Sequence, residues 1–303
     1  MKLLAPKYFN DFKCIADKCT HSCCVGWEID IDESTLEKYS SYKGNYCDNI
    51  KKSIEISDTP HFILEKSERC PHLNERGLCK IIINAGKDYL CDICREHPRF
   101  YNYTNHGKEV GLGMSCEEAC RVILNSDNYG EMIELEEIDE ELDTCDFDAV
   151  EFRSFIYSVI SNSSAPFTEK MDDLYELTSV FPEILDDSQW KEVISQLEYL
   201  DNSHKELFLN YSSFAEAPKE LELYLERAFA YFVYRHCSES TDKMEFLARL
   251  GFAMFCERLL CSICHNADEI FDYARIISEE LEYSEENTEI IVEKFIEFFE
   301  KSE

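Results

Sequence analysis

The sequence comprises 303 residues with 16 Cys, 30 Lys or Arg and 63 Asp or Glu, which gives a formal net charge of −33 at pH 7. So acidic a chain lacks the basic surface that nucleic-acid phosphates require, which excludes nucleic acid as a partner. No apolar run approaches the roughly 20 residues that span a bilayer, and the amino-terminal segment has no apolar core of signal-peptide length. We therefore expect a cytoplasmic protein without membrane partners, in which clustered cysteines bind metal rather than form disulfides.

The charge is unevenly distributed, and this predicts the domain organisation. Residues 1–123 contain 17 Lys or Arg and 19 Asp or Glu, whereas the remainder contains 13 and 44, a net charge of −31. Residues 1–123 also hold 11 of the 16 cysteines and seven of the nine glycines. We expect a Cys-rich metal module over 1–123, an acidic linker over 124–150 and a helical domain over 151–303.

Eight cysteines of the first module have the short spacings that let neighbouring thiolates converge on one ion or cluster. These candidate metal ligands are Cys19, Cys23, Cys24, Cys70, Cys79, Cys91, Cys94 and Cys116. Four thiolates suffice for a [4Fe–4S] cluster or a structural zinc ion. One site with spare thiols and two separate sites both fit this array.

The ligand candidates differ in how well their spacing suits a single metal. Cys91-x2-Cys94 is the firmest pair, because this spacing lets both thiolates meet one metal at a turn. Cys23 and Cys24 are adjacent, and consecutive side chains diverge, so one is expected to bind and the other to pack. His72 and His97 lie close to these cysteines, and we favour for them a hydrogen-bonding role around the metal over direct ligation.

Apolar residues after position 150 recur with the period of a helix. Helices are predicted from residue 152, after Pro218 as a first-turn proline, and around 243–264, 267–282 and 285–301. The fold class is therefore mainly α, with a small irregular Cys-rich α+β module packed on an α-helical bundle. Cys237, Cys261 and Cys264 fall within these helices, and we interpret them as core residues despite the Cys-x2-Cys-His string that ends at His265.

Several strings resemble the flagellin lysine-N-methylase family. The strongest lie in the first third of the chain and the two weaker ones near its end: 23–32 (CCVGWEIDID), 70–79 (CPHLNERGLC), 90–100 (LCDICREHPRF), 115–119 (SCEEA), 231–236 (YFVYRH) and 282–287 (EYSEEN). The first-third motif also resembles small Cys-cluster proteins described only as zinc or iron chelators. The resemblance covers nearly the whole chain.

The resemblance implies an enzyme that transfers methyl groups from S-adenosylmethionine to lysine side chains of flagellin, with an iron–sulfur cluster on the cysteines. Two common signatures of such cofactor use are missing. Gly111-Leu112-Gly113 lacks a third glycine and precedes no clear helical pattern, so a Rossmann site is not indicated. The Cys-x3-Cys-x2-Cys spacing of radical adenosylmethionine enzymes is also absent, because position 26 is Gly.

Five residues are candidates for cofactor or substrate binding, and no catalytic residue is identified. Arg95 and Arg99 could bind the cofactor carboxylate bidentately, or pair with nearby acids. Trp27, like Tyr101 and Tyr103, could hold the lysine ammonium by cation–π contact, or Trp27 could cover the metal site as a core aromatic. The acidic half could attract a Lys-bearing partner.

Two other functions fit the same sequence. The first is a zinc-binding module that recruits a protein partner through the acidic helical half. The second is a metal or redox sensor that shares the cluster but transfers no methyl group. An absorption spectrum separates the first from an iron–sulfur protein, because zinc sites are colourless.

Overall fold

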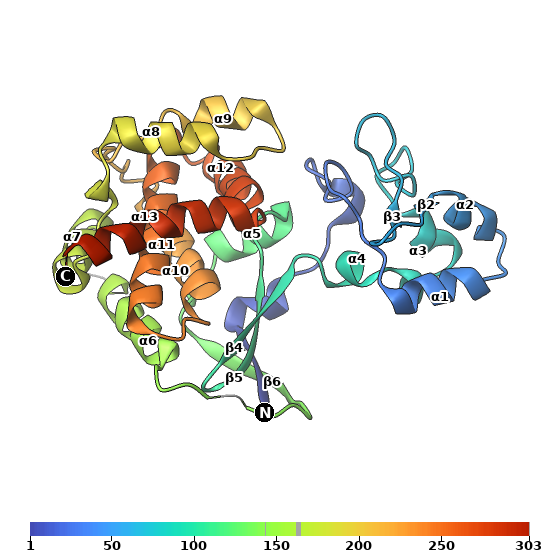
Figure 1. Ribbon diagram of the computed structural model, residues 1–303, viewed down its shortest axis with the longest axis horizontal. Coiled ribbons are helices and arrows are strands. Elements are labelled where there is room, and N and C mark those ends of the chain that lie inside the picture. Colours follow the sequence, from blue (N-terminus) through green and yellow to red (C-terminus); the bar gives the residue numbers. More distant parts are fainter. Residues whose placement is uncertain (143, 162–164, 303) are drawn as a thin grey trace. The chain divides into compact units, whose positions relative to one another are not determined.

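The computed structural model describes residues 1–142, 144–161 and 165–302, which form two compact units (Figure 1). Unit 1 consists of Met1–Phe12 and Phe100–Glu303, and unit 2 consists of Lys13–Arg99. These limits differ from the boundary at residue 123 expected from composition, because residues on both sides of unit 2 supply strands to unit 1. Unit 1 alone carries 17 Lys or Arg and 48 Asp or Glu, a net charge of −31.

The sheet of unit 1 has four strands in the order β4-β5-β1-β6. Their bounds are β1 Lys2–Pro6, β4 Arg99–Thr104, β5 Gly107–Leu112 and β6 Met132–Glu137. Strand β1 runs parallel to β5, with Leu4 opposite Glu109, and antiparallel to β6, with Ala5 opposite Ile133. Strand β6 lies inside the segment expected to be an acidic linker. Its apolar residues pair with β1, and Glu134 forms an ion pair with Lys2.

Helices make up most of unit 1, so the prediction of a mainly α protein is confirmed. They are α5 Glu117–Leu124, α6 Ala149–Ile160, α7 Phe167–Thr178, α8 Asp187–Gln196, α9 Asn202–Phe208, α10 Glu222–Cys237, α11 Lys243–Ile263, α12 Ile270–Ile277 and α13 Glu285–Ser302. A π-helix, Ser278–Glu282, follows α12 directly. Aspartates cap several of these helices, as Asp148 does for α6 and Asp242 for α11, because a carboxylate accepts the unpaired N–H groups of the first turn.

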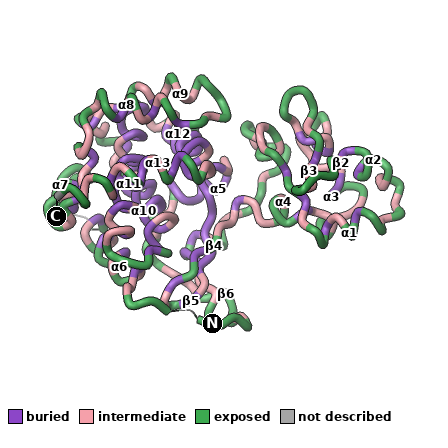
Figure 2. Tube along the Cα trace, in the orientation of Figure 1, coloured by how far each residue is buried: buried purple, intermediate pink, exposed green. Residues whose placement is uncertain are grey.

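The core of unit 1 is built around α10 and α11. Figure 2 shows buried residues concentrated along these helices and their neighbours, and Trp190 and Phe255 pack there with tilted rings whose centroids lie 4.6 Å apart. Pro218 was expected in the first turn of α10, but the helix begins four residues later at Glu222. The carbonyl of Pro218 instead accepts the Leu221 N–H in a preceding turn.

Unit 2 is a small module of short elements. They are α1 Glu33–Ser41, α2 Cys47–Lys52, β2 Ile54–Glu55, β3 His61–Phe62, α3 Lys80–Asn84 and α4 Asp92–Glu96. Strands β2 and β3 pair antiparallel, and isolated bridges join Val25 to Arg69 and Leu73 to Cys79. Its core consists of a few apolar side chains such as Ile29, Ile50 and Phe62 together with cysteines. So small a core is typical of modules that need cross-links or metal for stability.

Among the helices of residues 1–142, 144–161 and 165–302, none combines the length and apolarity needed to cross a membrane.

Candidate functional site

Five of the predicted ligand cysteines lie together in the core of unit 2. Cys70 and Cys91 are buried members of this core, and Cys24, Cys79 and Cys94 pack against it. They come from three separate sequence motifs. We call these five residues the thiol cluster.

Backbone pairing brings these motifs together. The Cys70 N–H donates to the carbonyl of Cys24 at 2.8 Å, beside the bridge that joins Val25 and Arg69. The bridge between Leu73 and Cys79 closes the second motif on itself. The motifs, which are separate in the sequence, therefore form one continuous scaffold.

Backbone N–H groups point at two of the sulfurs, as they do around metal thiolates. Burial raises the pKa of Cys70 to about 12, and the nearby Cys24, Cys79 and Cys91 add to this, while the N–H of His72 opposes it. Burial likewise raises the pKa of Cys79 against hydrogen bonds from the N–H groups of Ile81 and Ile82. Thiols this close cannot all ionise unless a cation compensates their charge, which is what a soft metal supplies.

Two pairs of thiols share hydrogen bonds. The S–H of Cys23 donates to Cys24 and, against the effect of burial, lowers the pKa of Cys24 to about 7. The S–H of Cys94 donates to Cys91, so the pKa of Cys91 is lowered and that of Cys94 is raised. In each pair the hydrogen bond makes the accepting thiol easier to ionise.

The backbone N–H of His72 points at Cys70 of the thiol cluster, and both ring nitrogens of His72 are already bonded. Nδ1 lies 3.0 Å from the Tyr46 hydroxyl and Nε2 lies 2.8 Å from the Ser53 hydroxyl. Burial lowers the pKa of His72 to about 4, so the ring is neutral near pH 7. This arrangement fits the hydrogen-bonding role expected for His72 rather than a ligand role. Burial also lowers the pKa of His97 to about 4.

The other predicted ligands lie outside this core. Cys19 and Cys23 belong to the loop before Trp27 in unit 2, where Trp27 is half-buried. Cys116 belongs to unit 1, where it occupies the position before the first turn of α5 and packs against the helical core. Within the described residues, no three His, Cys, Asp or Glu side chains are already arranged to hold a metal ion. The donor chemistry therefore fits a soft metal, while a finished ligand geometry is not preformed.

The arginines expected to bind a cofactor carboxylate have contacts with their neighbours. Arg95 forms ion pairs with Asp92 and Glu96 on the exposed surface of α4. Arg99 lies within 3.5 Å of the carbonyl oxygens of Arg95 and Glu96. Their cofactor role stays a prediction.

Tyr101 and Tyr103, expected to flank a substrate amine, flank a lysine of this chain. The Lys108 ammonium lies 5.1 Å from the Tyr101 ring centroid and 4.9 Å from that of Tyr103, and it pairs with Glu140 at 3.0 Å. Cation–π contact by these rings is therefore realised inside unit 1 itself.

A second candidate site, missed by motif analysis, surrounds Glu282 at the end of the π-helix. Its carboxylate accepts a hydrogen bond from the Tyr231 hydroxyl at 3.1 Å and lies 2.7 Å from Nε2 of His236. Nε of Arg235 lies 3.3 Å from the same carboxylate. We call Tyr231, Arg235, His236, Glu282 and Tyr283 the Glu282 cluster.

The electrostatics of the Glu282 cluster follow from its burial. Burial lowers the pKa of His236, and the hydrogen bond to Glu282 opposes this only in part. Burial tends to raise the pKa of Glu282, but Arg235 and His236 together hold it below its ordinary value. Near pH 7 the carboxylate is therefore ionised while the imidazole is neutral. The sequence signal for this cluster was available, because 231–236 and 282–287 are the two weaker family-like strings.

Two glycines of β5 and the turn after it shape this site. A Cβ on Gly111 would lie 2.2 Å from the Phe100 ring, and a Cβ on Gly113 would lie 2.2 Å from the Tyr283 hydroxyl. Gly111-Leu112-Gly113 thus makes room for aromatic rings, and α5 does follow it, four residues after Gly113. The expectation that no helix follows was wrong, because the short α5 carries too few turns to give a clear period.

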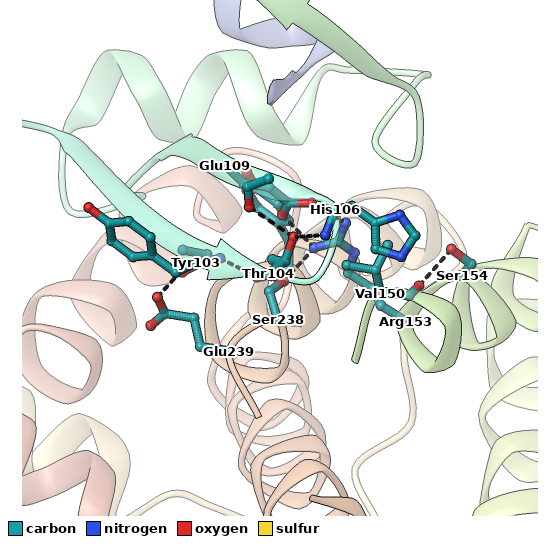
Figure 3. Close-up of polar contacts among 12 residues, drawn as sticks. Tyr103, Thr104, His106, Glu109, Val150, Arg153, Ser154, Ser238 and Glu239 are labelled. Carbon is teal, nitrogen blue, oxygen red and sulfur yellow. Dashed lines mark hydrogen bonds and ion pairs between the residues drawn. The ribbon is translucent and has the colours of Figure 1, made fainter. Parts of the chain in front are cut away.

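A buried ion pair connects β5 to α6. Arg153 of α6 donates from Nη1 and Nη2 to the two carboxylate oxygens of Glu109 at 2.7 and 2.8 Å, and Nη1 also reaches Ser238 (Figure 3). Both side chains are almost fully buried, and both terminal nitrogens of Arg153 are paired with Glu109. We interpret this pair as the link that joins the sheet to the helices.

The C-terminal cysteines are core residues in this structure. Cys237, Cys256, Cys261 and Cys264 are all buried in the helical core. The thiols of Cys261 and Cys264 donate to the carbonyls of Ala215 and Asn266. These contacts fit the interpretation that the Cys-x2-Cys-His string is incidental.

Comparison with known proteins finds relatives for part of the chain. No family model and no solved structure matches it. It is 27% identical over 134 residues to a Lysine-N-methylase of Salmonella choleraesuis (strain SC-B67) and to one of Salmonella typhimurium (strain LT2). These matches cover 40% of this chain and 32% of each relative, so the chain spans about a third of their length.

A further relative is shorter and is matched more completely. The chain is 27% identical over 127 residues to the flagellar biosynthetic protein FliU of Salmonella muenchen, a match that covers 40% of this chain and 75% of that protein. Both kinds of relative agree with the family suggested by the cysteine motifs. The resemblance of this chain to the flagellin lysine-N-methylase family is thereby confirmed.

Proposed function

We propose that this protein is an enzyme that methylates lysine side chains of flagellin, with S-adenosylmethionine as methyl donor and an iron–sulfur cluster on the N-terminal thiols. The observation that carries the proposal is the similarity to the Lysine-N-methylases of Salmonella. The structure adds that the two C-terminal family-like strings meet at Glu282. A function for the Glu282 cluster follows from its chemistry.

Lysine methylation requires that the substrate ammonium lose a proton before its nitrogen can attack. His236 suits this task because its neutral ring donates from Nε2 to the Glu282 carboxylate, which leaves Nδ1 with a free lone pair. Glu282 would then stabilise the imidazolium that forms. S-adenosylmethionine, when bound, would supply an electrophilic methyl group, and its sulfur would leave as a neutral thioether.

The thiol cluster would hold the metal centre. Cys24, Cys70, Cys79, Cys91 and Cys94 are the donors that lie together, and N–H groups already point at two of their sulfurs. A cluster bound there would cross-link three motifs of a unit with a small core and supply redox chemistry. Cys19, Cys23 and Cys116 stay predicted additional ligands.

Electrostatics favour a lysine-bearing partner. Unit 1 has a net charge of −31, so it attracts cationic segments before any specific contact forms. Raising the salt from about 10 mM to about 1 M shortens the Debye length from about 30 Å to about 3 Å. Methyl transfer should therefore become slower as salt rises, through weaker substrate capture.

The test is the intact mass of flagellin after incubation with anaerobically purified protein, reductant and S-adenosylmethionine. The proposal predicts added methyl mass that depends on the protein and on the donor. The same preparation should contain iron and acid-labile sulfide. Stoichiometric zinc without sulfide would refute the iron–sulfur assignment, and flagellin of unchanged mass beside an intact metal centre would refute the substrate. Absence of methyl transfer to any protein would favour a zinc-binding interaction module or a sensor.

A further inference from the structure

Arg235 is held rigidly within unit 1 by groups on three sides. Its Nε lies 3.3 Å from the Glu282 carboxylate. Its guanidinium carbon lies 4.6 Å from the ring centroid of Phe100 and 4.8 Å from that of Tyr283. The side chain is only 13% exposed, so these contacts fix the direction in which its terminal nitrogens point.

One terminal nitrogen of this arginine has no use in the fold. Nη1 of Arg235 is buried and has no hydrogen-bond partner among the described residues. In Arg227, Arg258 and Arg275 the unpaired buried atom is Nε instead. Arg153, which is buried to a similar degree, uses both terminal nitrogens on Glu109. A buried donor without a partner destabilises a protein, so it calls for a ligand or an ordered water.

The surroundings of Arg235 are built to keep this geometry. The rings of Phe100 and Tyr283 pack where only glycine fits at Gly111 and Gly113. The π-helix that ends at Glu282 places its carboxylate against Nε, and π-helices are rare outside functional sites. Two glycines and a π-helix thus form the surroundings of the Arg235 guanidinium.

A guanidinium with its Nε already bonded and a terminal nitrogen free recognises planar oxyanions, above all carboxylates. Glu282 accepts from His236, our proposed proton acceptor, and lies beside Arg235. In S-adenosylmethionine a short carbon chain joins the carboxylate to the sulfonium. Anchoring that carboxylate at Arg235 therefore leaves the methyl group within reach of an amine at His236.

We propose that Arg235 binds the carboxylate of the amino-acid half of S-adenosylmethionine through Nη1. This inference rests on the proposed methyltransferase function. It differs from the sequence-based expectation that Arg95 and Arg99 serve this purpose, since Arg95 is exposed and already paired with Asp92 and Glu96.

The experiment compares two ligands that differ only in the carboxylate. Calorimetry on the full chain measures the affinity for S-adenosylmethionine and for decarboxylated S-adenosylmethionine. The variants are Arg235→Gln and Arg235→Lys, with Arg95→Gln for the rival anchor. Arg121→Gln serves as the matched control, because Arg121 of α5 forms its ion pair with Glu118 one turn away. The affinity for the decarboxylated ligand also shows whether the binding site is still folded in each variant.

Wild-type protein should prefer the complete cofactor by about 10- to 100-fold, the effect expected of a hydrogen bond to a charged group. Arg235→Gln should abolish that preference and leave the affinity for the decarboxylated ligand unchanged, and Arg235→Lys should retain part of it. Arg95→Gln and Arg121→Gln should leave the preference intact.

Three results overturn the inference. One is an undiminished preference in Arg235→Gln, and a second is a preference lost only in Arg95→Gln. Both would leave the methyltransferase proposal standing if flagellin is still methylated. The third is a wild-type protein that binds neither ligand, which would remove the proposed donor as well. A preference that depends on Arg235 in a protein that methylates nothing would uphold this site and refute the proposed reaction.

Discussion

Asp32 accepts a hydrogen bond from the backbone N–H of Asp92, with 2.9 Å between Oδ2 and N. Its other oxygen accepts from the N–H of Thr35 at 2.9 Å, which caps α1. One carboxylate thus ties the end of the first cysteine motif to the turn that carries Cys91 and Cys94. Burial tends to raise the pKa of Asp32, but these hydrogen bonds together with one from Ser34 hold it below its ordinary range.

Replacing Asp32 by Ala should destabilise unit 2 by about 1–2 kcal/mol, the usual loss for a helix cap and its partner N–H. The metal content should fall with it, because the Cys91–Cys94 turn loses its tether. Proteolysis within residues 13–99 and iron analysis of the full chain measure the two effects. Asp30→Ala is the matched control, because Asp30 is an exposed acid on the same segment. Equal iron and equal protease resistance in Asp32→Ala would contradict this role.

The pair formed by Glu109 and Arg153 should be the most sensitive ionic contact of unit 1. Glu109→Gln leaves a buried guanidinium without its counter-charge, which should reduce the free energy of unfolding by about 3–5 kcal/mol. Urea denaturation of the full chain measures this loss. Glu140→Gln breaks the partly exposed contact of Lys108 and should cost less than about 1 kcal/mol. Comparable losses in the two variants would show that burial does not set the strength of these pairs.

Histidine 236 should make unit 1 less stable in mild acid. Burial lowers its pKa in the folded state, whereas an unfolded histidine titrates at about 6.5. Between these two values the unfolded chain binds more protons, so stability falls as the pH drops below about 6.5 and is unaffected by this group above it. The groups that face His236 are Glu282, Arg235 and Arg249, which stay charged over this range.

The measurement is the urea midpoint on both sides of that pKa, at about pH 7.5 and about pH 5.5. His236→Gln should lose part of the pH dependence seen in the wild type. His265→Gln changes an exposed histidine and should retain all of it. A pH dependence that is identical in His236→Gln and wild type would show that His236 is not the group responsible.

The thiol cluster predicts which cysteines matter for metal content. Cys91→Ser or Cys94→Ser should lose metal and loosen unit 2, because metal binding and folding are coupled in so small a module. Cys261→Ala and Cys264→Ala remove buried thiols of the helical core. These variants should retain the metal and lose about 1–2 kcal/mol of stability. Metal and acid-labile sulfide analysis distinguishes the sets. Metal retained in Cys94→Ser, or lost in Cys264→Ala, would contradict the ligand assignment.

Local patterns in the sequence predicted the helices well. The periodic runs gave α11 and α13 nearly to the residue, because long amphipathic helices carry several turns of signal, while α6 begins at Ala149, three residues before the expected start. The segment 267–282 was expected as one helix but divides into α12 and the π-helix. The π-helix is only five residues long, about one turn, which is too short to show its different period in the sequence.

Long-range pairing was the part that the sequence did not reveal. Strand β1 pairs with β5 and β6, more than a hundred residues away, and this removes residues 1–12 from the Cys-rich module. The same limitation hid the Glu282 cluster, since Tyr231 and Glu282 are 51 residues apart and each belongs to a different family-like string. The sequence showed which cysteines are close within each motif, but it did not show the pairing of Cys70 with Cys24 that brings the motifs together.

The central claim is that this protein transfers methyl groups to flagellin lysines with the help of its thiol-bound metal centre. The most direct test is peptide mass spectrometry of flagellin treated with S-adenosylmethionine and either wild-type, Cys94→Ser or Cys264→Ser protein. The account predicts methylated lysines with wild type and Cys264→Ser and none with Cys94→Ser. Unmodified lysines in all three samples, or equal methylation by Cys94→Ser, would contradict it.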